Sequence, residues 1–256
     1  MRGDVSAEHT AIKRCIQVVA NFGFISRSIF EDELVVASRV HRWRVWQKIL
    51  STGYFRSYRD AFLKDDVITF SKTAIMRLDK SIKPVKPIPV QNLSHDEHVM
   101  RFALHNENKM LIENIQTEAM LKRDNNVRFS IGHKDRKIKY PDLLFSLAVP
   151  GKHIQVAFEC ERTRKAFQAY RAFLIAYAGL PGIDFVIVAC QSKAIVTALK
   201  ESMRLMSYPA KERPIAFCLI DEVTANPSNF GLDLNGSVTS LRSIVQNLKA
   251  KTASAA

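Results

Sequence analysis

Residues 140–162 read YPDLLFSLAVPGKHIQVAFECER and contain two apolar segments bordered by acidic side chains. The segments 143–149 and 153–160 are predicted to be strands of one sheet. Asp142 comes just before the first strand, and Glu159 and Glu161 stand at the end of the second. Because side chains alternate across a strand, Glu159 and Glu161 should point to the same face, where a neighbouring strand could bring Asp142 close to them.

Helices and strands are expected to alternate around these two strands. A helix is predicted to begin with Ser94 as its N-cap and Glu97 as the capping-box partner, and to run to about Lys122. The further expected elements are a strand over 127–131, a charged turn over 135–139, helices over 163–178 and 193–206, and strands over 185–190 and 215–220. This order predicts an α/β domain with a mixed sheet.

A proline-rich segment divides the chain. Pro84, Pro87 and Pro89 fall within six residues. Proline has no amide donor and favours extended geometry in the residue before it, so the segment 83–90 is predicted to be a stiff linker. The expected domains are therefore residues 1–82 and residues 91–256.

The pattern of residues 1–82 predicts three helices followed by two strands. The expected elements are a helix that ends near Gly23, a short helix from Ser26 to Leu34, a helix that opens at Ala37 or Ser38 and ends at Gly53, and strands over 54–64 and 67–70 that turn at Asp65-Asp66. This order resembles a winged helix-turn-helix, in which the third helix is the recognition helix and the two strands form the wing.

The chain carries a large excess of positive charge. Its formal net charge is +13 and its isoelectric point is about 9.7. Nucleic acid is the commonest polyanionic partner of such a protein, and a merely solubilising surface is the alternative. Between Arg39 and Lys64 there are seven basic residues and one acidic residue, which favours DNA contact over a solvated helix face. The two tryptophans of this stretch, Trp43 and Trp46, are expected to lie in the core.

The candidate DNA-contacting residues belong to three segments. They are Arg39, Arg42, Arg44 and Lys48 in the third helix, Arg56 and Arg59 in the wing, and Lys134, Arg136, Lys137 and Lys139 just before Pro141. Basic side chains at the edge of a recognition helix and on a wing meet the phosphates of double-stranded DNA. For the third segment, a solvated turn is an equally good interpretation.

The acidic residues suggest a metal site, although some of them also have ordinary structural explanations. Grouped carboxylates repel one another and favour a hard divalent cation such as Mg²⁺, which can polarise a phosphate and supply a hydroxide. Alternatively, Asp142 belongs to a turn, and Glu161 and Lys165 form an exposed i,i+4 pair. Glu159 is harder to explain in this way, because it closes an apolar run in which an unpaired carboxylate is costly.

Four short motifs carry a resemblance to a known family. They are Leu93-Ser94-His95-Asp96, Tyr140-Pro141-Asp142, Phe158-Glu159-Cys160-Glu161-Arg162, and the following Lys165 and Tyr170. Together with the strand order they resemble the PD-(D/E)XK nuclease superfamily. In particular the chain is similar to replication-relaxation proteins and to MOBC-type mobilisation relaxases, over roughly residues 5–220. The resemblance implies an N-terminal winged helix-turn-helix followed by a restriction-endonuclease-like mixed-sheet domain.

The same resemblance implies roles for four residues. Asp142 and Glu159 would be ligands of Mg²⁺ or Mn²⁺. Glu161 stands where the motif has a lysine and would be a third metal ligand. In this superfamily the basic residue can move to the next helix, and Lys165 or Arg162 would take its place and stabilise charge on the phosphate.

Three functions are compatible with these features. The first is a relaxase that nicks one strand of double-stranded DNA at a plasmid transfer origin in a metal-dependent reaction, together with other relaxosome proteins. The second is a DNA-binding regulator of replication or mobilisation whose nuclease-like core is inactive. The third is a restriction-type endonuclease that cuts both strands. The chain has no histidine triad of the kind used by tyrosine relaxases, but attack by Tyr140 or Tyr170 stays open.

The remaining features concern the compartment. Cys15, Cys160, Cys190 and Cys218 are isolated from one another in the sequence and are predicted to be reduced core residues. No signal peptide is apparent, and the longest apolar stretch is too short to span a bilayer. The expectation is a protein of the bacterial cytoplasm that does not insert into a membrane. The oligomeric state is left open.

Overall fold

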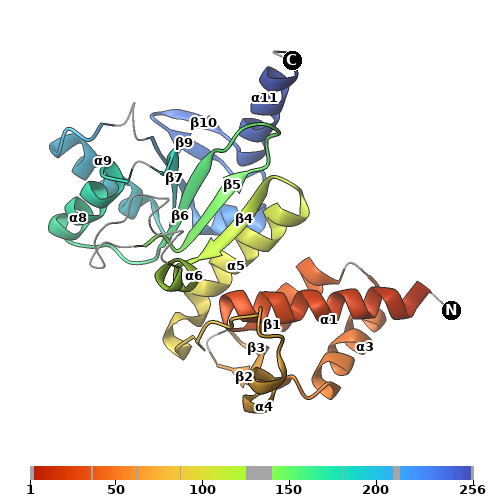
Figure 1. Cartoon of the computed structure of the whole chain (residues 1–256). Helices are drawn as coiled ribbons and strands as arrows, with labels where there is room; N and C mark the ends of the chain where they lie inside the picture. Colours follow the sequence, from red (N-terminus) through yellow and green to blue (C-terminus); the bar gives the residue numbers. More distant parts are fainter. Residues whose placement is uncertain are drawn as a thin grey trace. The chain divides into compact units, whose positions relative to one another are not determined.

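The computed structural model of the chain describes residues 3–35, 37–61, 63–86, 88–124, 140–180, 182–209 and 214–254. The chain forms two compact units, Met1–Met100 and Arg101–Ala256 (Figure 1). The boundary lies within one helix, α5, so the first unit extends past the predicted linker at 83–90. None of the described helices is both long enough and apolar enough to cross a membrane.

The first unit, called unit 1 below, combines helices with a small antiparallel sheet. Its elements are α1 (Gly3–Phe22), β1 (Ile25–Ser26), α2 (Arg27–Ile29), the π-helical turn η1 (Phe30–Leu34), α3 (Arg39–Ser51), β2 (Phe55–Asp60), β3 (Asp65–Phe70), α4 (Lys72–Arg77) and the 3-10 turn η2 (Val90–Asn92). The three strands have the order β1-β3-β2. Both pairings are antiparallel.

Local side-chain chemistry sets the helix starts in unit 1. The Ser26 hydroxyl accepts a hydrogen bond from the Ile29 amide, and the Ser38 hydroxyl accepts one from His41. Each bond satisfies an amide that has no partner in the first turn of a helix. The predicted cap of the second helix, Ser26, is therefore confirmed, and of the two predicted starts of the third helix, Ala37 and Ser38, Ser38 is the N-cap.

The predicted position of the wing turn is wrong. Asp65 and Asp66 are not in the turn but in β3, where they pair with Asp60 and Arg59. The chain reverses between Asp60 and Asp65, and the Asp60 carboxylate accepts a hydrogen bond from the Leu63 amide at 2.8 Å. Because this hydrogen bond between a side chain and the backbone stabilises the reversal, the turn comes before Asp65 and not at the predicted Asp65-Asp66.

The proline-rich segment is packed against unit 1. The Val85 amide donates to the Ala20 carbonyl at 2.8 Å. Gly23 has a φ of 83°, and a Cβ at this position would lie 3.1 Å from the Lys86 carbonyl oxygen. A glycine is therefore needed where α1 ends, both for its positive φ and for this close approach.

The second unit, called unit 2 below, is built on a seven-stranded sheet, which confirms the predicted mixed α/β class. Its elements are α5 (Leu93–Asn108), which begins in unit 1, β4 (Ile112–Thr117), α6 (Glu118–Arg123), β5 (Leu143–Leu147), β6 (Gln155–Glu161), α8 (Phe167–Ala178), β7 (Phe185–Cys190), α9 (Lys193–Leu205), β8 (Ile215–Leu219), α10 (Ile220–Ala225), β9 (Leu232–Leu234), β10 (Ser237–Thr239) and α11 (Leu241–Ala253). The strand order is β10-β9-β8-β7-β6-β5-β4. The β6–β7 and β7–β8 pairs are parallel, and the others are antiparallel.

The prediction of one helix from Ser94 to about Lys122 is wrong. Helix α5 begins at Leu93 and ends at Asn108, and the chain then forms β4, which pairs with β5. The expected capping box is also absent, because the Glu97 carboxylate accepts a hydrogen bond from the Ser26 hydroxyl instead, at 2.6 Å. The predicted strand over 127–131 and the turn over 135–139 lie outside the described residues.

Two layers of side chains cover the sheet of unit 2. On one face, Leu144 and Ala157 belong to a core cluster with Tyr170 and Tyr177 of α8. On the other face, Phe102 of α5 stacks on Phe158 with ring centroids 4.2 Å apart. Figure 1 shows α8 and α9 on one side of the strands and α5 on the other. Because Glu159 lies two residues beyond Ala157, its side chain points to the α8 face.

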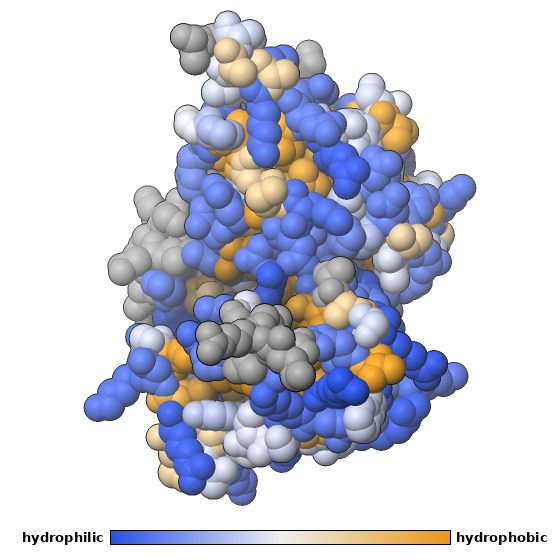
Figure 2. Space-filling model, turned by 90° about the vertical axis from the view of Figure 1, so that its right-hand side faces the viewer, coloured by the Kyte–Doolittle hydropathy of each residue, from blue (hydrophilic) through white to orange (hydrophobic). Residues whose placement is uncertain are grey.

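The surface of the protein is mainly hydrophilic on one face, and its cysteines lie in the interior. On the face drawn in Figure 2, hydrophilic residues predominate and hydrophobic ones form separate patches. All four cysteines are free and buried, as predicted.

Candidate functional site

Asp142 lies across from Glu159 at the edge where β5 begins. Leu143 pairs with Phe158 in the antiparallel β5–β6 register, so the next pair along the strands is Asp142 and Glu159. The Asp142 Oδ2 accepts a hydrogen bond from the Cys160 amide at 2.8 Å. The predicted approach of Asp142 to the acidic end of β6 is therefore present, but the Asp142 carboxylate is engaged with the backbone.

Glu159 is buried and bonded to a residue that the sequence analysis did not single out. Glu159 is only 2% exposed, and its Oε1 accepts a short hydrogen bond from the Tyr177 hydroxyl. Burial raises the pKa of Tyr177 well above its usual value, and the charge of Glu159 raises it further. A protonated phenol therefore offers a donor to the carboxylate, which offsets part of the cost of burying it.

The helical spacing of the sequence indicates that Tyr177 is a buried residue of α8. It lies seven residues after Tyr170 on α8, and the two are on one helix face together with Phe173. A tyrosine on a buried helix face needs a partner for its hydroxyl. The acidic end of β6 supplies that partner.

Glu161 and Lys165 form the expected ion pair, but the prediction that it is exposed is wrong for Glu161, which is buried. The Lys165 Nζ lies 2.6 Å from the Glu161 Oε2, with side-chain exposures of 42% and 10%. Helix α8 begins at Phe167 and not at residue 163, so this pair does not lie within a helix. Instead the Lys165 amide donates to the Tyr170 hydroxyl at 3.0 Å, which fixes the segment beside β6.

The three carboxylates are not assembled into a metal site. Among the residues that the structure describes, no group of three or more histidine, cysteine, aspartate or glutamate side chains is placed to hold a metal ion. Carboxylate oxygens are suitable ligands for Mg²⁺. However, each candidate carboxylate already has a protein partner: the Cys160 amide, the Tyr177 hydroxyl or the Lys165 ammonium. The donor set as it stands does not fit a three-carboxylate cation site.

The tyrosines considered as nucleophiles are both buried. Tyr140 is 5% exposed and Tyr170 is 1% exposed. The Tyr170 hydroxyl accepts the hydrogen bond from Lys165, and burial raises the pKa of its phenol. Both features disfavour a tyrosinate that attacks a phosphodiester.

The basic residues of unit 1 fall into two groups. Arg39, Arg44 and Arg56 have exposed side chains on α3 and β2. Arg42 is half-buried, and its Nη1 donates to the Glu31 carbonyl at 3.1 Å, so it ties α3 to η1. Lys48 is exposed but forms an ion pair with Glu8 of α1. The predicted cations of the third helix thus differ in how freely they can meet a partner.

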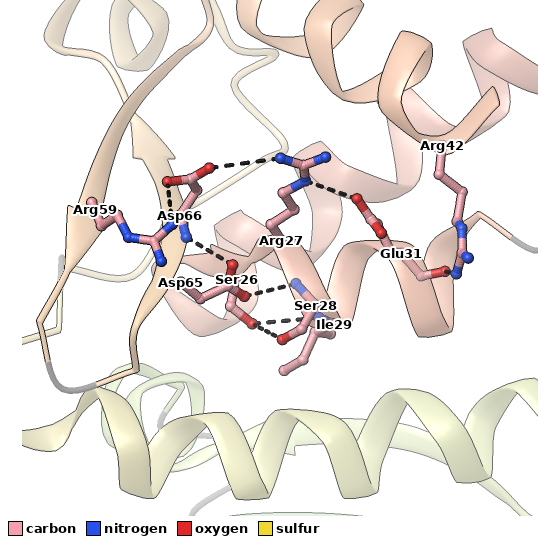
Figure 3. Close-up of polar contacts among 9 residues, drawn as sticks. All are labelled: Ser26, Arg27, Ser28, Ile29, Glu31, Arg42, Arg59, Asp65 and Asp66. Atoms are coloured by element: carbon pink, nitrogen blue, oxygen red, sulfur yellow. Dashed lines mark hydrogen bonds and ion pairs between the residues drawn. The ribbon is translucent and has the colours of Figure 1, made fainter. Parts of the chain in front are cut away.

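The hairpin of β2 and β3 is held to α2 by a charged network (Figure 3). Asp66 lies between two arginines, 3.5 Å from the Arg59 Nη1 and 3.8 Å from the Arg27 Nη1. The Asp65 carboxylate accepts a hydrogen bond from the Ser28 amide at 2.8 Å. These groups line a pocket to which Arg39 and Lys64 also contribute. Arg59 is therefore partly neutralised within unit 1.

The third predicted group of DNA-contacting residues cannot be placed. Lys134, Arg136, Lys137 and Lys139 lie outside the described residues.

Comparisons of the chain with protein-family models, with curated proteins and with solved structures found no match.

Proposed function

We propose that the protein binds double-stranded DNA through unit 1, which acts as a winged helix-turn-helix. Helix α3 would enter the major groove, and the β2–β3 hairpin would lie against the backbone as the wing. The observation that carries this proposal is the charge of α3, whose sequence RVHRWRVWQKILS contains four cations and no acid. A helix fits the width of the major groove, and exposed cations at its edges meet phosphates.

The order of elements in unit 1 supports the same proposal. A helix, a short strand, two helices and a hairpin follow one another, and β1 completes the sheet beside β3. Helix α3 buries Val45, Trp46 and Ile49. Because these residues fix one side of the helix in the core, the other side is presented to a partner.

The test measures affinity for a labelled DNA duplex as a function of salt, using the full chain. Each phosphate contact contributes a slope of about −0.9 to the dependence of log K on log salt. The double variant Arg39→Ala/Arg44→Ala should lower the affinity and make the slope shallower by about 2. The double variant Arg171→Ala/Lys193→Ala, which removes two exposed cations of unit 2, is the matched control. No measurable binding at low salt, or equal losses in both variants, would contradict the proposal.

A second function, cleavage of one DNA strand, is favoured by the cross-strand placement of Asp142 and Glu159. In the form that the family resemblance implies, unit 2 is a restriction-endonuclease-like domain of a bacterial relaxase. It would nick a plasmid transfer origin with Mg²⁺ or Mn²⁺, together with other relaxosome proteins. All three carboxylates already interact with donors of the protein itself, which favours the alternative, a DNA-binding regulator with an inactive nuclease-like core.

Nicking of supercoiled plasmid separates these two possibilities. Plasmid carrying a transfer origin is incubated with the protein and Mg²⁺ or Mn²⁺, and open-circular product is measured. Asp142→Asn and Glu159→Gln should abolish nicking if unit 2 is an enzyme. Asp184→Asn is the control, because the Asp184 carboxylate also accepts a hydrogen bond from a β6 amide, that of Gln155, at 2.7 Å. Unchanged plasmid with every metal supports the regulator, and linear product supports a restriction-type nuclease.

A further inference from the structure

The outward face of α3 carries large apolar side chains that the core does not use. Trp43 is 51% exposed and Val40 is 59% exposed, whereas Val45, Trp46 and Ile49 are at most 1% exposed. Residues three apart on a helix are neighbours, so Val40 and Trp43 form one exposed apolar surface. The prediction that both tryptophans are core residues is confirmed for Trp46 and is wrong for Trp43.

A neutral polar group completes this surface. Gln47 follows Trp43 by four residues and is exposed. Successive residues of a helix are about 100° apart. Val40, Trp43 and Gln47 therefore form a stripe along the outward face, with Arg39 on one side of it and Arg44 and Lys48 on the other.

We infer that this stripe, Val40, Trp43 and Gln47, contacts base edges and makes the DNA binding sequence-specific. The inference rests on the proposed function and goes beyond it, because binding through phosphates alone carries no sequence information. The flanking cations and the absence of any acid in α3 match the charge of a DNA groove. A double helix is therefore the occupant that this face fits.

The chemistry of the three side chains indicates which bases they recognise. A glutamine amide can form two hydrogen bonds with adenine, to N7 and from the 6-amino group, in the major groove. Valine and the edge of an indole ring make apolar contacts of the kind that the thymine methyl group accepts. The expected target is a duplex with A·T pairs at neighbouring positions under α3, while Arg39 and Arg44 contact the phosphates on either side.

The experiment selects duplexes from a pool with a randomised central segment, using the full chain, and sequences the retained fraction. Wild-type protein should enrich a sequence that contains neighbouring A·T pairs. Gln47→Ala should reduce the preference at one base pair by about tenfold. Val40→Ala and Trp43→Ala should relax the preference for thymine. Because all three side chains are neutral, the salt dependence of binding should not change.

Two matched controls report on unspecific effects of substitution. Gln17→Ala removes an exposed glutamine from α1, and Val238→Ala removes a valine that is 74% exposed on β10 of unit 2. Both should leave the selected sequence unchanged. Circular dichroism of each variant verifies that unit 1 remains folded, which is expected because the three side chains lie outside the core.

Each other outcome overturns the inference in a distinguishable way. If duplexes are retained without enrichment, or if Gln47→Ala keeps the wild-type preference, DNA binding stands but base recognition by this stripe does not. If no duplex is retained at low salt, the proposed function fails as well. If the sedimentation of the protein depends on its concentration and Trp43→Ala abolishes that dependence without any sequence enrichment, the stripe is a protein interface.

Discussion

Unit 1 and unit 2 hold their charged side chains in opposite ways. On α3 and the β2–β3 hairpin most cations lie on the surface: Arg39, Arg44 and Arg56 are exposed, and only Arg42 is half-buried among the cations of α3. At the end of β6 the anions lie inside, where Glu159 is 2% and Glu161 is 8% exposed. Each of these carboxylates has a donor in the same unit, Tyr177 or Lys165.

This difference determines what substitution can reveal. Removing an exposed cation changes stability by only a few tenths of a kcal/mol, so a loss of DNA affinity can be attributed to lost contacts. Removing one partner of a buried pair changes stability itself, because the other partner stays buried without compensation. Any role of unit 2 in chemistry must therefore be separated from its role in folding.

The largest expected effect concerns Lys165. If Lys165 stabilises charge on the phosphate, Lys165→Ala should lower nicking by about 100-fold, in the range found when one stabilising donor is removed. The variant should lose only about 1 kcal/mol of unfolding free energy, because Glu161 then lacks its partner. Activity is therefore measured well below the unfolding transition. Lys122→Ala is the control, since Lys122 forms an i,i+4 pair with Glu118 at 2.7 Å. Equal nicking by the two variants would leave Lys165 as a structural partner only.

The next effect concerns the buried bond between Tyr177 and Glu159. Tyr177→Phe removes the donor and should lower the unfolding free energy at neutral pH by about 2 kcal/mol, measured by urea denaturation. Tyr54→Phe is the control, because Tyr54 is only half-buried and lies in unit 1. A loss as small as that of the control would mean that Glu159 does not depend on this donor.

The same variant tests the pH dependence of stability. Burial raises the pKa of the Tyr177 phenol in the folded state well above its ordinary value of 10.0. As the pH rises past 10, the unfolded chain releases the phenolic proton while the folded chain retains it, so stability is lost on the alkaline side. Tyr177→Phe should make that alkaline loss shallower. An unchanged alkaline slope would contradict the raised pKa.

Much of the fold follows from local patterns. Ser26 and Ser38 cap helices where the sequence predicts, because the capping bond lies within three residues of the cap. Strand β7 agrees with the prediction from the apolar, β-branched run 185–190, which is typical of a strand covered on both faces. The strand β4 was missed because two of its central residues, Glu113 and Asn114, are exposed and polar. Its strand conformation depends on pairing with β5, which is distant in sequence.

The candidate site was predictable in position but not in its bonding. The alternation of side chains places Glu159 and Glu161 on one face of β6, and the β5–β6 register brings Asp142 opposite Glu159. The donors that engage them come from the β6 backbone and from α8, and their choice depends on how the helix packs on the sheet. In the same way, helical spacing alone does not tell which of Trp43 and Trp46 faces the core. That distinction depends on where η1 lies, because Phe30 packs against Trp46 with ring centroids 5.1 Å apart.

The smallest expected effect concerns Asp66, whose carboxylate lies close to two arginines at the β2–β3 hairpin. Asp66 lies 3.8 Å from Arg27 and 3.5 Å from Arg59. Asp66→Asn removes this acid and makes Arg59 more available to phosphates, whereas Arg27 keeps its ion pair with Glu31 at 2.7 Å. Affinity for duplex DNA should rise by about threefold at low salt, with a steeper salt dependence. The unfolding free energy should fall by less than about 1 kcal/mol, because these ion pairs are partly exposed. Asp233→Asn is the matched control: Asp233 is paired with Lys200 in unit 2, and its side chain is 33% exposed, as is that of Asp66. Both variants raise the net charge equally, so a larger gain for Asp66→Asn locates the DNA contact at the hairpin, and equal gains would attribute it to net charge alone.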